Sequence, residues 1–351
     1  MKNYKILAIN PGSTTTKLAY YADGEIKQRL EVFHPTEQLG EIMDQLTMRT
    51  EMVAQFLKEN DIKVEELDMI VARGARLPGI STGAYEVNEA MVGYLPTHTG
   101  NHASTLACMI GKNLGDPYGV KCMIYDSVSA DDYMPEAKTT GVPECEHLMV
   151  CHVLNSRMVA HKAAEEMGKK YEDCNFIVVH LGGGSSVSAH KHGRIMDCIS
   201  NDRGPMSPER SGGLSTTPLA ELCYSGKYTK SEMMKLLMGK GGMVQLLGTQ
   251  DMRAIEDMFN AGDEKAVAAV NAMAYQHART IAGMMAPLEG QVDKVIYTGG
   301  LCRFKGFVEI IKSYLPWLTS VEYPGEFEME GLIQGTIRVL EGEEPLKPFS
   351  L

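Results

Sequence analysis

The sequence predicts an α/β fold built from two copies of one domain. Two segments, residues 6–24 and 176–193, share the order strand, small-residue loop, strand and X-Gly turn. Similar patterns half a chain apart indicate a duplicated domain, with matching loops that face one cleft. Strands alternate with helices elsewhere, which is typical of α/β layers.

Two helices can be placed from caps and periodicity. Asp263 is a good N-cap, and apolar residues follow it at helical spacing until Pro287. Asn155 or Ser156 can cap another helix, which we expect to end at Gly168. The repeat puts a domain boundary near residue 150.

Length and charge narrow the classes of function. The chain has 351 residues, enough for roughly two domains, and a net charge of −11. An acidic chain without a basic run does not favour nucleic acid or anionic lipid as a partner. Its eight cysteines lack metal-ligand spacing, and no apolar run reaches the roughly 20 residues of a membrane helix. We therefore expect a cytoplasmic protein that binds no membrane.

The two small-residue loops are candidate phosphate sites. Gly and small hydroxyl residues let backbone N–H groups approach an anion closely, as in 182–186. That segment lacks the third Gly of the dinucleotide fingerprint, and a tight β-hairpin is the alternative. The second copy at Gly12-Ser13, which ends on Lys17, favours phosphate binding, although Lys17 can also be a solvated strand lysine.

Polar residues at strand ends are further candidates. Asn10 and His180 occupy matching places in the two copies, where either can simply satisfy a turn. Asp126 follows the buried run 123–125, a usual site position in open α/β sheets, although it can also be a turn or capping residue. Arg73 and Arg210 stand beside glycines and can bind carboxylate or phosphoryl oxygens, although surface arginines are common.

These residues resemble the acetate and butyrate kinases of the sugar kinase, actin and heat-shock chaperone ATPase superfamily. Residues 10–17 are similar to the family segment N-x-G-S-[ST]-[ST]-x-K, and residues 180–186 to H-L-G-x-G-x-S. The butyrate kinase branch is the closer match. Six further segments resemble that branch: 86–91, 102–104, 207–212, 226–229, 239–242 and 273–276.

The resemblance implies two ribonuclease H-like domains, 1–150 and 151–328, with an ATP cleft between them and residues 329–351 completing the first. The first phosphate loop would be lined by Asn10, Ser13, Thr15 and Lys17. The second would be lined by His180, Gly182, Gly183, Gly184, Ser185 and Ser186. Adenosine would lie at Asp251, Arg253, Gly299, Gly300 and Leu301.

The resemblance also implies the catalytic groups. Arg73 and Arg210 would hold the carboxylate and the transferring phosphoryl group, and Asp126 would be the catalytic aspartate. Glu328 would lie near Mg²⁺. The implied reaction is reversible, ATP-dependent phosphorylation of butyrate or a branched C4–C5 acid by a homodimer or larger homo-oligomer.

Some positions depart from the family pattern. Ser156 and Gly183 stand where acetate kinases carry His and Asn, which argues against acetate kinase proper. Ala75-Arg76 and the segment 127–129 are unusual for the butyrate branch and leave the acyl substrate open. The alternatives are an acetate or propionate kinase, a non-catalytic ATP-gated module of the same fold, and a sugar kinase.

Overall fold

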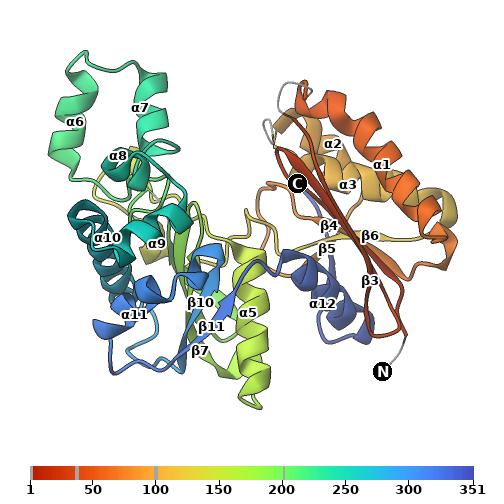
Figure 1. Ribbon diagram of the computed structural model, residues 1–351. Helices are drawn as coiled ribbons and strands as arrows, with labels where there is room; N and C mark the ends of the chain where they lie inside the picture. Colours follow the sequence, from red (N-terminus) through yellow and green to blue (C-terminus); the bar gives the residue numbers. More distant parts are fainter. Residues whose placement is uncertain (1–2, 36–38, 99–101, 201) are drawn as a thin grey trace. The chain divides into compact units, whose positions relative to one another are not determined.

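The computed structural model describes residues 3–35, 39–98, 102–200 and 202–351 (Figure 1). They form two compact units. The first comprises Met1–Asp131, Val153–Met158 and Phe327–Leu351, and the second Asp132–His152 and Val159–Glu326. By contacts, the division thus falls after Asp131, while the repeat in the sequence puts it near residue 150. No helix among the described residues is long and apolar enough to cross a membrane.

The first unit is built on a seven-stranded sheet. Its strands are β1 (Ile6–Pro11), β2 (Thr15–Ala22), β3 (Glu25–Phe33), β4 (Met69–Arg73), β5 (Ala84–Glu86), β6 (Cys122–Tyr125) and β12 (Leu346–Pro348). They lie in the order β12-β5-β6-β4-β1-β2-β3. Strand β1 is antiparallel to β2 and parallel to β4, which is parallel to β6. All six residues of β1 are buried, as expected for a central strand covered on both faces.

The second unit repeats this arrangement with five strands. They are β7 (Asn175–Leu181), β8 (Ser185–Lys191), β9 (Arg194–Ile199), β10 (Lys294–Gly299) and β11 (Ser320–Pro324), in the order β11-β10-β7-β8-β9. Strand β7 is antiparallel to β8 and parallel to β10, which is parallel to β11. Order and direction match β6-β4-β1-β2-β3, so the predicted duplication is confirmed.

Both predicted X-Gly hairpin turns are present. Asp23 and Gly24 have φ of 52° and 82°, and His192 and Gly193 have φ of 52° and 73°. Positive φ at both central residues is typical of a type I′ turn, whose twist matches that of the flanking strands.

Helices cover both faces of the first sheet. They are η2 (Ile42–Gln45), α1 (Leu46–Glu59), η3 (Val64–Glu66), α2 (Glu89–His98), α3 (Ser104–Gly115), η4 (Asp116–Tyr118) and α12 (Glu328–Glu341). Figure 1 shows α1–α3 on one face and α12 on the other. The side chains of β1 alternate accordingly: Leu7 packs in the core beneath α1 and α3, whereas Ile6 packs with Leu332 of α12.

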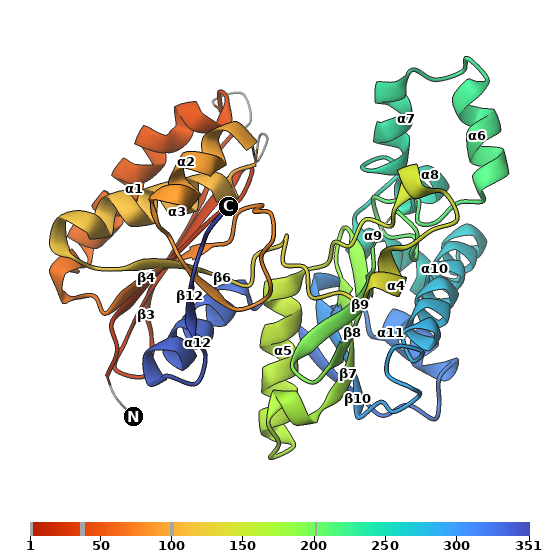
Figure 2. The same ribbon diagram turned by 180° about the vertical axis from the view of Figure 1, so that it is seen from behind.

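The second unit is richer in helices, although the first residues of one of them, Val153–Met158, belong to the first unit. They are α4 (Pro135–Lys138), η5 (Pro143–Cys145), α5 (Val153–Glu166), η6 (Tyr171–Asp173), α6 (Thr216–Tyr224), α7 (Lys230–Leu237), α8 (Met243–Leu247), α9 (Met252–Asn260), α10 (Glu264–Gly283), η7 (Gly300–Arg303) and α11 (Lys305–Ser313). Helices α9–α11 share an apolar core with the sheet. Figure 2 shows α6 and α7 as a helical pair that extends away from that sheet.

One of the two predicted helix starts is correct. Asp263 caps α10 through a hydrogen bond from the Ala266 N–H to its carboxylate, 2.9 Å long. The prediction of a cap at Asn155 or Ser156 is wrong, because α5 begins at Val153. Asn155 instead accepts a hydrogen bond from the Phe327 N–H at 2.8 Å. A short polar side chain can bond to a distant backbone group as well as to its own helix, and local sequence does not distinguish the two.

We predict that Gly335→Ala destabilises the protein. Gly335 lies on α12, and an added Cβ would sit 2.5 Å from the Tyr125 ring of β6. Overpacking of this kind costs about 1–3 kcal/mol. Gly283→Ala, on α10, is the control, since nothing lies within 4 Å of its Cβ position. Urea unfolding should show a loss for Gly335→Ala and no loss for Gly283→Ala; equal effects would contradict this packing.

Candidate active site

In the first unit, the candidate residues gather at one edge of the sheet. Strands β1, β4 and β6 run parallel, so their carboxyl ends meet at this edge. Asn10 lies at the end of β1, Arg73 ends β4, and Asp126 follows β6. Three residues from distant parts of the sequence are thereby brought to neighbouring strand ends.

Arg73 is held in place by two side chains. Its Nη1 donates to Asn10 Oδ1 at 3.3 Å, and its Nη2 lies 3.1 Å from Glu328 Oε1. Asn10 Nδ2 also donates to Glu328 Oε2, at 2.9 Å. The Arg73 side chain remains 29% exposed. The structure thus brings together three residues that the sequence analysis selected, and it presents an anchored guanidinium that can still bind an anion.

Asp126 is buried beside a cation that the sequence analysis missed. Arg157 Nη1 lies 2.6 Å from Asp126 Oδ1, which also accepts from the Gly83 N–H at 2.8 Å. The other oxygen, Oδ2, has no hydrogen-bond partner among the described residues. Burial raises the pKa of Asp126, and the neighbouring Arg157 only partly opposes that rise. Asp126 also has a φ of 47°, an uncommon value for a residue other than glycine.

The two departures from the butyrate branch near Arg73 contact each other. Ser127 donates its hydroxyl to the Ala75 carbonyl oxygen. Ser129 donates to the Leu77 carbonyl at 2.9 Å and accepts from the Leu77 N–H at 2.8 Å. At Gly74, an added Cβ would sit 2.6 Å from Ser127 Cα. The loops after β4 and β6 are therefore joined closely.

Cationic groups gather near Arg73. Arg76 is exposed, and His102 lies close enough that both arginines affect its titration. Burial lowers the pKa of His102, and Arg73 and Arg76 lower it further. The imidazole is therefore neutral near pH 7, and the two guanidinium groups carry the positive charge here.

The β1–β2 loop carries the remaining candidates of this unit. Ser13 lies in the loop and is exposed, and Thr15 begins β2 and is partly exposed. Lys17 pairs across the sheet with Glu31 of β3 at 3.3 Å, which agrees with the alternative of a strand lysine. The buried Arg49 of α1, which the sequence analysis missed, donates hydrogen bonds to this loop. It lies on the same helix face as the buried Val53 and so interrupts an apolar stripe.

In the second unit, the matching loop joins β7 to β8. His180 lies near the end of β7, and its imidazole stacks on that of His152, with ring centroids 3.7 Å apart. His152 Nδ1 lies 3.0 Å from Ser186 Oγ, at the start of β8. Burial lowers the pKa of His180 to about 4, so its imidazole is neutral near pH 7. The sequence analysis missed His152, because it placed the start of the following helix at Asn155 or Ser156 instead of Val153.

Gly183 connects this loop to the segment that carries Arg210. The Gly183 carbonyl accepts from Ser207 Oγ at 2.7 Å and from the Glu209 N–H at 3.3 Å. Glu209 in turn lies 3.1 Å from Arg210 Nη1. A Cβ on Gly183 would meet the Glu209 carboxylate at 3.0 Å. Loop residues 182–186 and Arg210, separate in sequence, therefore form one cluster.

The residues assigned to adenosine fall into two groups. Gly299 has a φ of 92°, and a Cβ there would sit 2.2 Å from the Leu181 carbonyl oxygen. The backbone of Gly299 thus packs directly against the end of β7. The next residue, Gly300, is exposed, and Leu301 is buried. Asp251, directly before α9, and Arg253 on α9 are both exposed. Asp251 caps the helix by accepting from the Arg253 N–H at 3.0 Å. Capping this helix is a structural role that Asp251 can have without any bound ligand.

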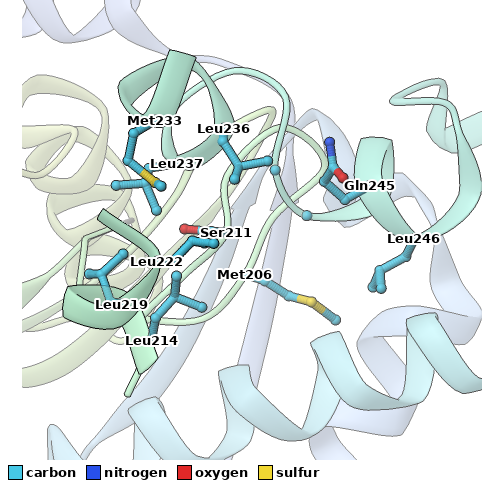
Figure 3. Close-up of a pocket in the computed structure, with 12 residues that line it drawn as sticks. Met206, Ser211, Leu214, Leu219, Leu222, Met233, Leu236, Leu237, Gln245 and Leu246 are labelled. Atoms are coloured by element: carbon cyan, nitrogen blue, oxygen red, sulfur yellow. The ribbon is translucent and has the colours of Figure 1, made fainter. Parts of the chain in front are cut away.

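An apolar pocket of about 220 Å³ lies among α6, α7, α8 and the segment from Met206 to Leu214 (Figure 3). Its lining comprises Met206, Ser211, Leu214, Leu219, Leu222, Met233, Leu236, Leu237, Gly241, Gly242, Gln245 and Leu246. Figure 3 shows that helical leucines and a methionine surround the hollow. None of the predicted site residues lines it, but Met206 and Ser211 belong to the segment that carries Arg210.

The chain is similar over its whole length to proteins named for butyrate. It is 43% identical to the probable butyrate kinase 2 of Caldanaerobacter subterraneus subsp. tengcongensis, over 99% of both chains. It is 40% identical to the probable butyrate kinase of Clostridium botulinum, over 99% of this chain and 100% of that one. The acetokinase family profile matches residues 150–310.

Solved structures share the fold at lower identity. Porphyromonas gingivalis acetate kinase is 18% identical with a TM-score of 0.78, covering 96% of this chain and 100% of that one. A propionate kinase from Francisella tularensis is 17% identical with a TM-score of 0.76, covering 94% and 98%. The actin-like ATPase fold predicted from the sequence is thereby confirmed, and the chain belongs to the acetokinase family.

The depressed pKa of His180 predicts that acid weakens the fold. Its neutral form is favoured in the folded state, so this contribution is complete above pH 6.5 and is lost as pH falls toward about 4. For this one group, the free energy of unfolding should drop by about 2 kcal/mol from about pH 7.5 to about pH 5. Urea unfolding of His180→Gln should show that much less pH dependence. The exposed His192→Gln is the control, and an unchanged slope in His180→Gln would contradict the prediction.

Proposed function

We propose that this protein transfers the γ-phosphoryl group of ATP to a short-chain fatty acid, butyrate or a branched C4–C5 acid, reversibly. The observation that carries the proposal is the full-length similarity to two proteins named as probable butyrate kinases. The anchored Arg73 agrees with it, because a planar guanidinium binds a carboxylate through two parallel hydrogen bonds.

The chemistry requires little help from a base. A carboxylate oxygen attacks the γ-phosphorus, the bond from that phosphorus to the bridging oxygen of ADP breaks, and acyl phosphate and ADP result. The carboxylate is already ionised, so no proton must be removed. What the reaction needs is alignment and positive charge around the transferring group.

Each cluster supplies part of this requirement. Arg73 orients the carboxylate, since Asn10 and Glu328 restrict its guanidinium. Arg210 lies beside the 182–186 loop, where it neutralises charge on the transferring phosphoryl group. The stacked and neutral His180 donates or accepts a hydrogen bond without adding charge.

Mg²⁺ fits the carboxylates of the first unit. Magnesium in kinases binds one or two protein carboxylates and otherwise takes waters and phosphate oxygens. Among the described residues, no group of three or more His, Cys, Asp or Glu side chains forms a complete metal site, in keeping with such partial coordination. Asp126 Oδ2, buried and without a donor in the described chain, and the carboxylate of Glu328 are the groups that would hold it, directly or through water. When bound, Mg²⁺ neutralises phosphate charge.

Asp126 also has a positioning role in the proposal. The contacts of its carboxylate with Arg157 and Gly83 both fall on Oδ1, so these two residues fix the carboxylate and leave the buried Oδ2 without a donor in the described chain. A cytoplasmic location and an assembly of two or more copies stay predictions from the sequence.

We predict that Arg210→Ala lowers turnover about 100- to 1,000-fold, since it removes positive charge needed mainly in the transition state. Steady-state assays of acyl phosphate formation at saturating ATP and butyrate measure this. Arg194→Ala is the control: Arg194 lies at the β9 start and donates to the Asp132 carbonyl. If Arg210→Ala keeps more than a tenth of wild-type turnover, the assignment of Arg210 to the transferring phosphoryl group is wrong.

We predict that four- and five-carbon acids exceed acetate in kcat/KM. Each buried methylene contributes about 0.8 kcal/mol, or about fourfold, so butyrate should gain roughly tenfold over acetate. Kinetics with acetate, propionate, butyrate, isobutyrate and valerate decide the question. A steady fall from acetate upward would favour the acetate kinase alternative, and a preference for a dicarboxylate would implicate the exposed Arg76.

A further inference from the structure

Arg49 is a buried arginine beneath the first phosphate loop. It lies on α1, near the start of that helix, and its relative exposure is 0%. Burial of a guanidinium costs free energy unless its N–H groups find acceptors. The identity of those acceptors therefore shows what Arg49 is for.

The acceptors are mostly carbonyl oxygens of the β1–β2 loop. Arg49 Nη1 donates to the Thr15 carbonyl and to Thr16 Oγ1, both at 2.8 Å. Its Nη2 donates to the Gly12 carbonyl at 3.1 Å and to the Ser13 carbonyl at 3.4 Å. The Arg49 side chain thus donates hydrogen bonds to three of the four backbone carbonyls between Gly12 and Thr15.

A second side chain fixes the orientation of the guanidinium. Gln45 Oε1 accepts from Arg49 Nε at 3.1 Å and from Nη2 at 2.9 Å. Gln45 itself is held by a bond from its Nε2 to the Gly40 carbonyl at 3.0 Å. Gln45 therefore fixes the plane of the guanidinium through its Nε and Nη2 groups.

The remaining carbonyl of the loop is also engaged. The Thr14 carbonyl accepts from the His34 N–H at 2.7 Å, so each carbonyl from Gly12 to Thr15 has a protein donor. In contrast, the N–H groups of Ser13 and Thr14 have no acceptor in the described part of the chain. The loop thus has its acceptors occupied by the protein and its donors available to an anion.

Arg49 also contributes charge. Within the described ranges, no Asp or Glu side chain forms an ion pair with it. Its acceptors are neutral amides, carbonyls and a hydroxyl, so its positive charge is not cancelled by a neighbouring carboxylate. Such a charge behind the loop adds to the attraction that the loop N–H groups exert on a phosphate.

We propose that Arg49 is the positioning residue that gives the Gly12–Thr15 loop its anion-binding polarity, through its hold on the loop carbonyls and through its charge. It does not touch the nucleotide. The inference rests on the proposed function for the identity of the anion, a phosphate group of ATP.

The test is Mg-ATP binding by Arg49→Met and Arg49→Lys, measured by titration calorimetry. Arg49→Met keeps apolar volume but removes both the donors and the charge, so we expect at least tenfold weaker binding. Arg49→Lys keeps the charge and some donors, so it should recover part of that loss. Arg338→Met is the matched control: Arg338 is a largely buried arginine of α12 that bonds Glu344 and Tyr125 instead of the loop.

The outcomes separate positioning from a merely structural role. Arg49→Met and Arg338→Met should both lower the unfolding temperature, but only Arg49→Met should weaken Mg-ATP binding. A destabilised Arg49→Met with wild-type affinity would overturn the proposal. If Arg49→Met does not fold, Gln45→Met is the second variant, because it removes only the acceptor that orients the guanidinium. It should weaken Mg-ATP binding several-fold, and an unchanged affinity would overturn the proposal as well.

The same experiment distinguishes this inference from the proposed function. If the wild-type protein binds Mg-ATP but forms no acyl phosphate, the proposed reaction is wrong, while the affinities of the Arg49 variants still decide the role of Arg49. If the wild-type protein binds no Mg-ATP, both proposals are wrong.

Discussion

The parallel direction of three strands in each sheet is the constraint on which the candidate site depends. Parallel neighbours end at one sheet edge, so the segments after β1, β4 and β6 adjoin, and so do those after β7 and β10. Glycines allow the close approach there. Gly74 passes Ser127, and Gly299 passes Leu181, at distances that leave no room for a Cβ. Side chains from distant parts of the chain thereby become neighbours.

The charged side chains at these edges form ion pairs that fix the orientation of each group but add little to the stability of the fold. Arg73 meets Glu328, Arg210 meets Glu209, and Asp126 meets Arg157. Of these three pairs, Asp126–Arg157 is buried, and its desolvation penalty roughly offsets its attraction. The other two are partly exposed, where water screens the attraction, so none of the three contributes much to the free energy of unfolding. They do fix the direction of each group. A fixed guanidinium is what a reaction that depends on alignment and charge requires.

Neutral groups complete the arrangement. Burial keeps His180 uncharged near pH 7, and its stack on His152 restricts the ring. In the first unit, burial also lowers the pKa of His34, which lies 2.9 Å from Thr16 Oγ1. Thr16 Oγ1 also accepts a hydrogen bond from Arg49. Burial therefore favours the neutral imidazole of His34, and the contact with Thr16 restricts its ring.

The sequence by itself determined the features that depend on neighbouring residues. Strand periodicity, X-Gly turns and helix caps are local, so the duplication, both hairpin turns and the Asp263 cap could be predicted. Phosphate binding by the two small-residue loops stays a prediction. Only the tertiary structure decided which side chains hold these loops. Arg49, His152 and Arg157 act through contacts with residues 31 to 37 positions away. Such pairings depend on how helices pack on the sheets, and a single sequence records the period of a helix but not the residue that its polar side chain will meet.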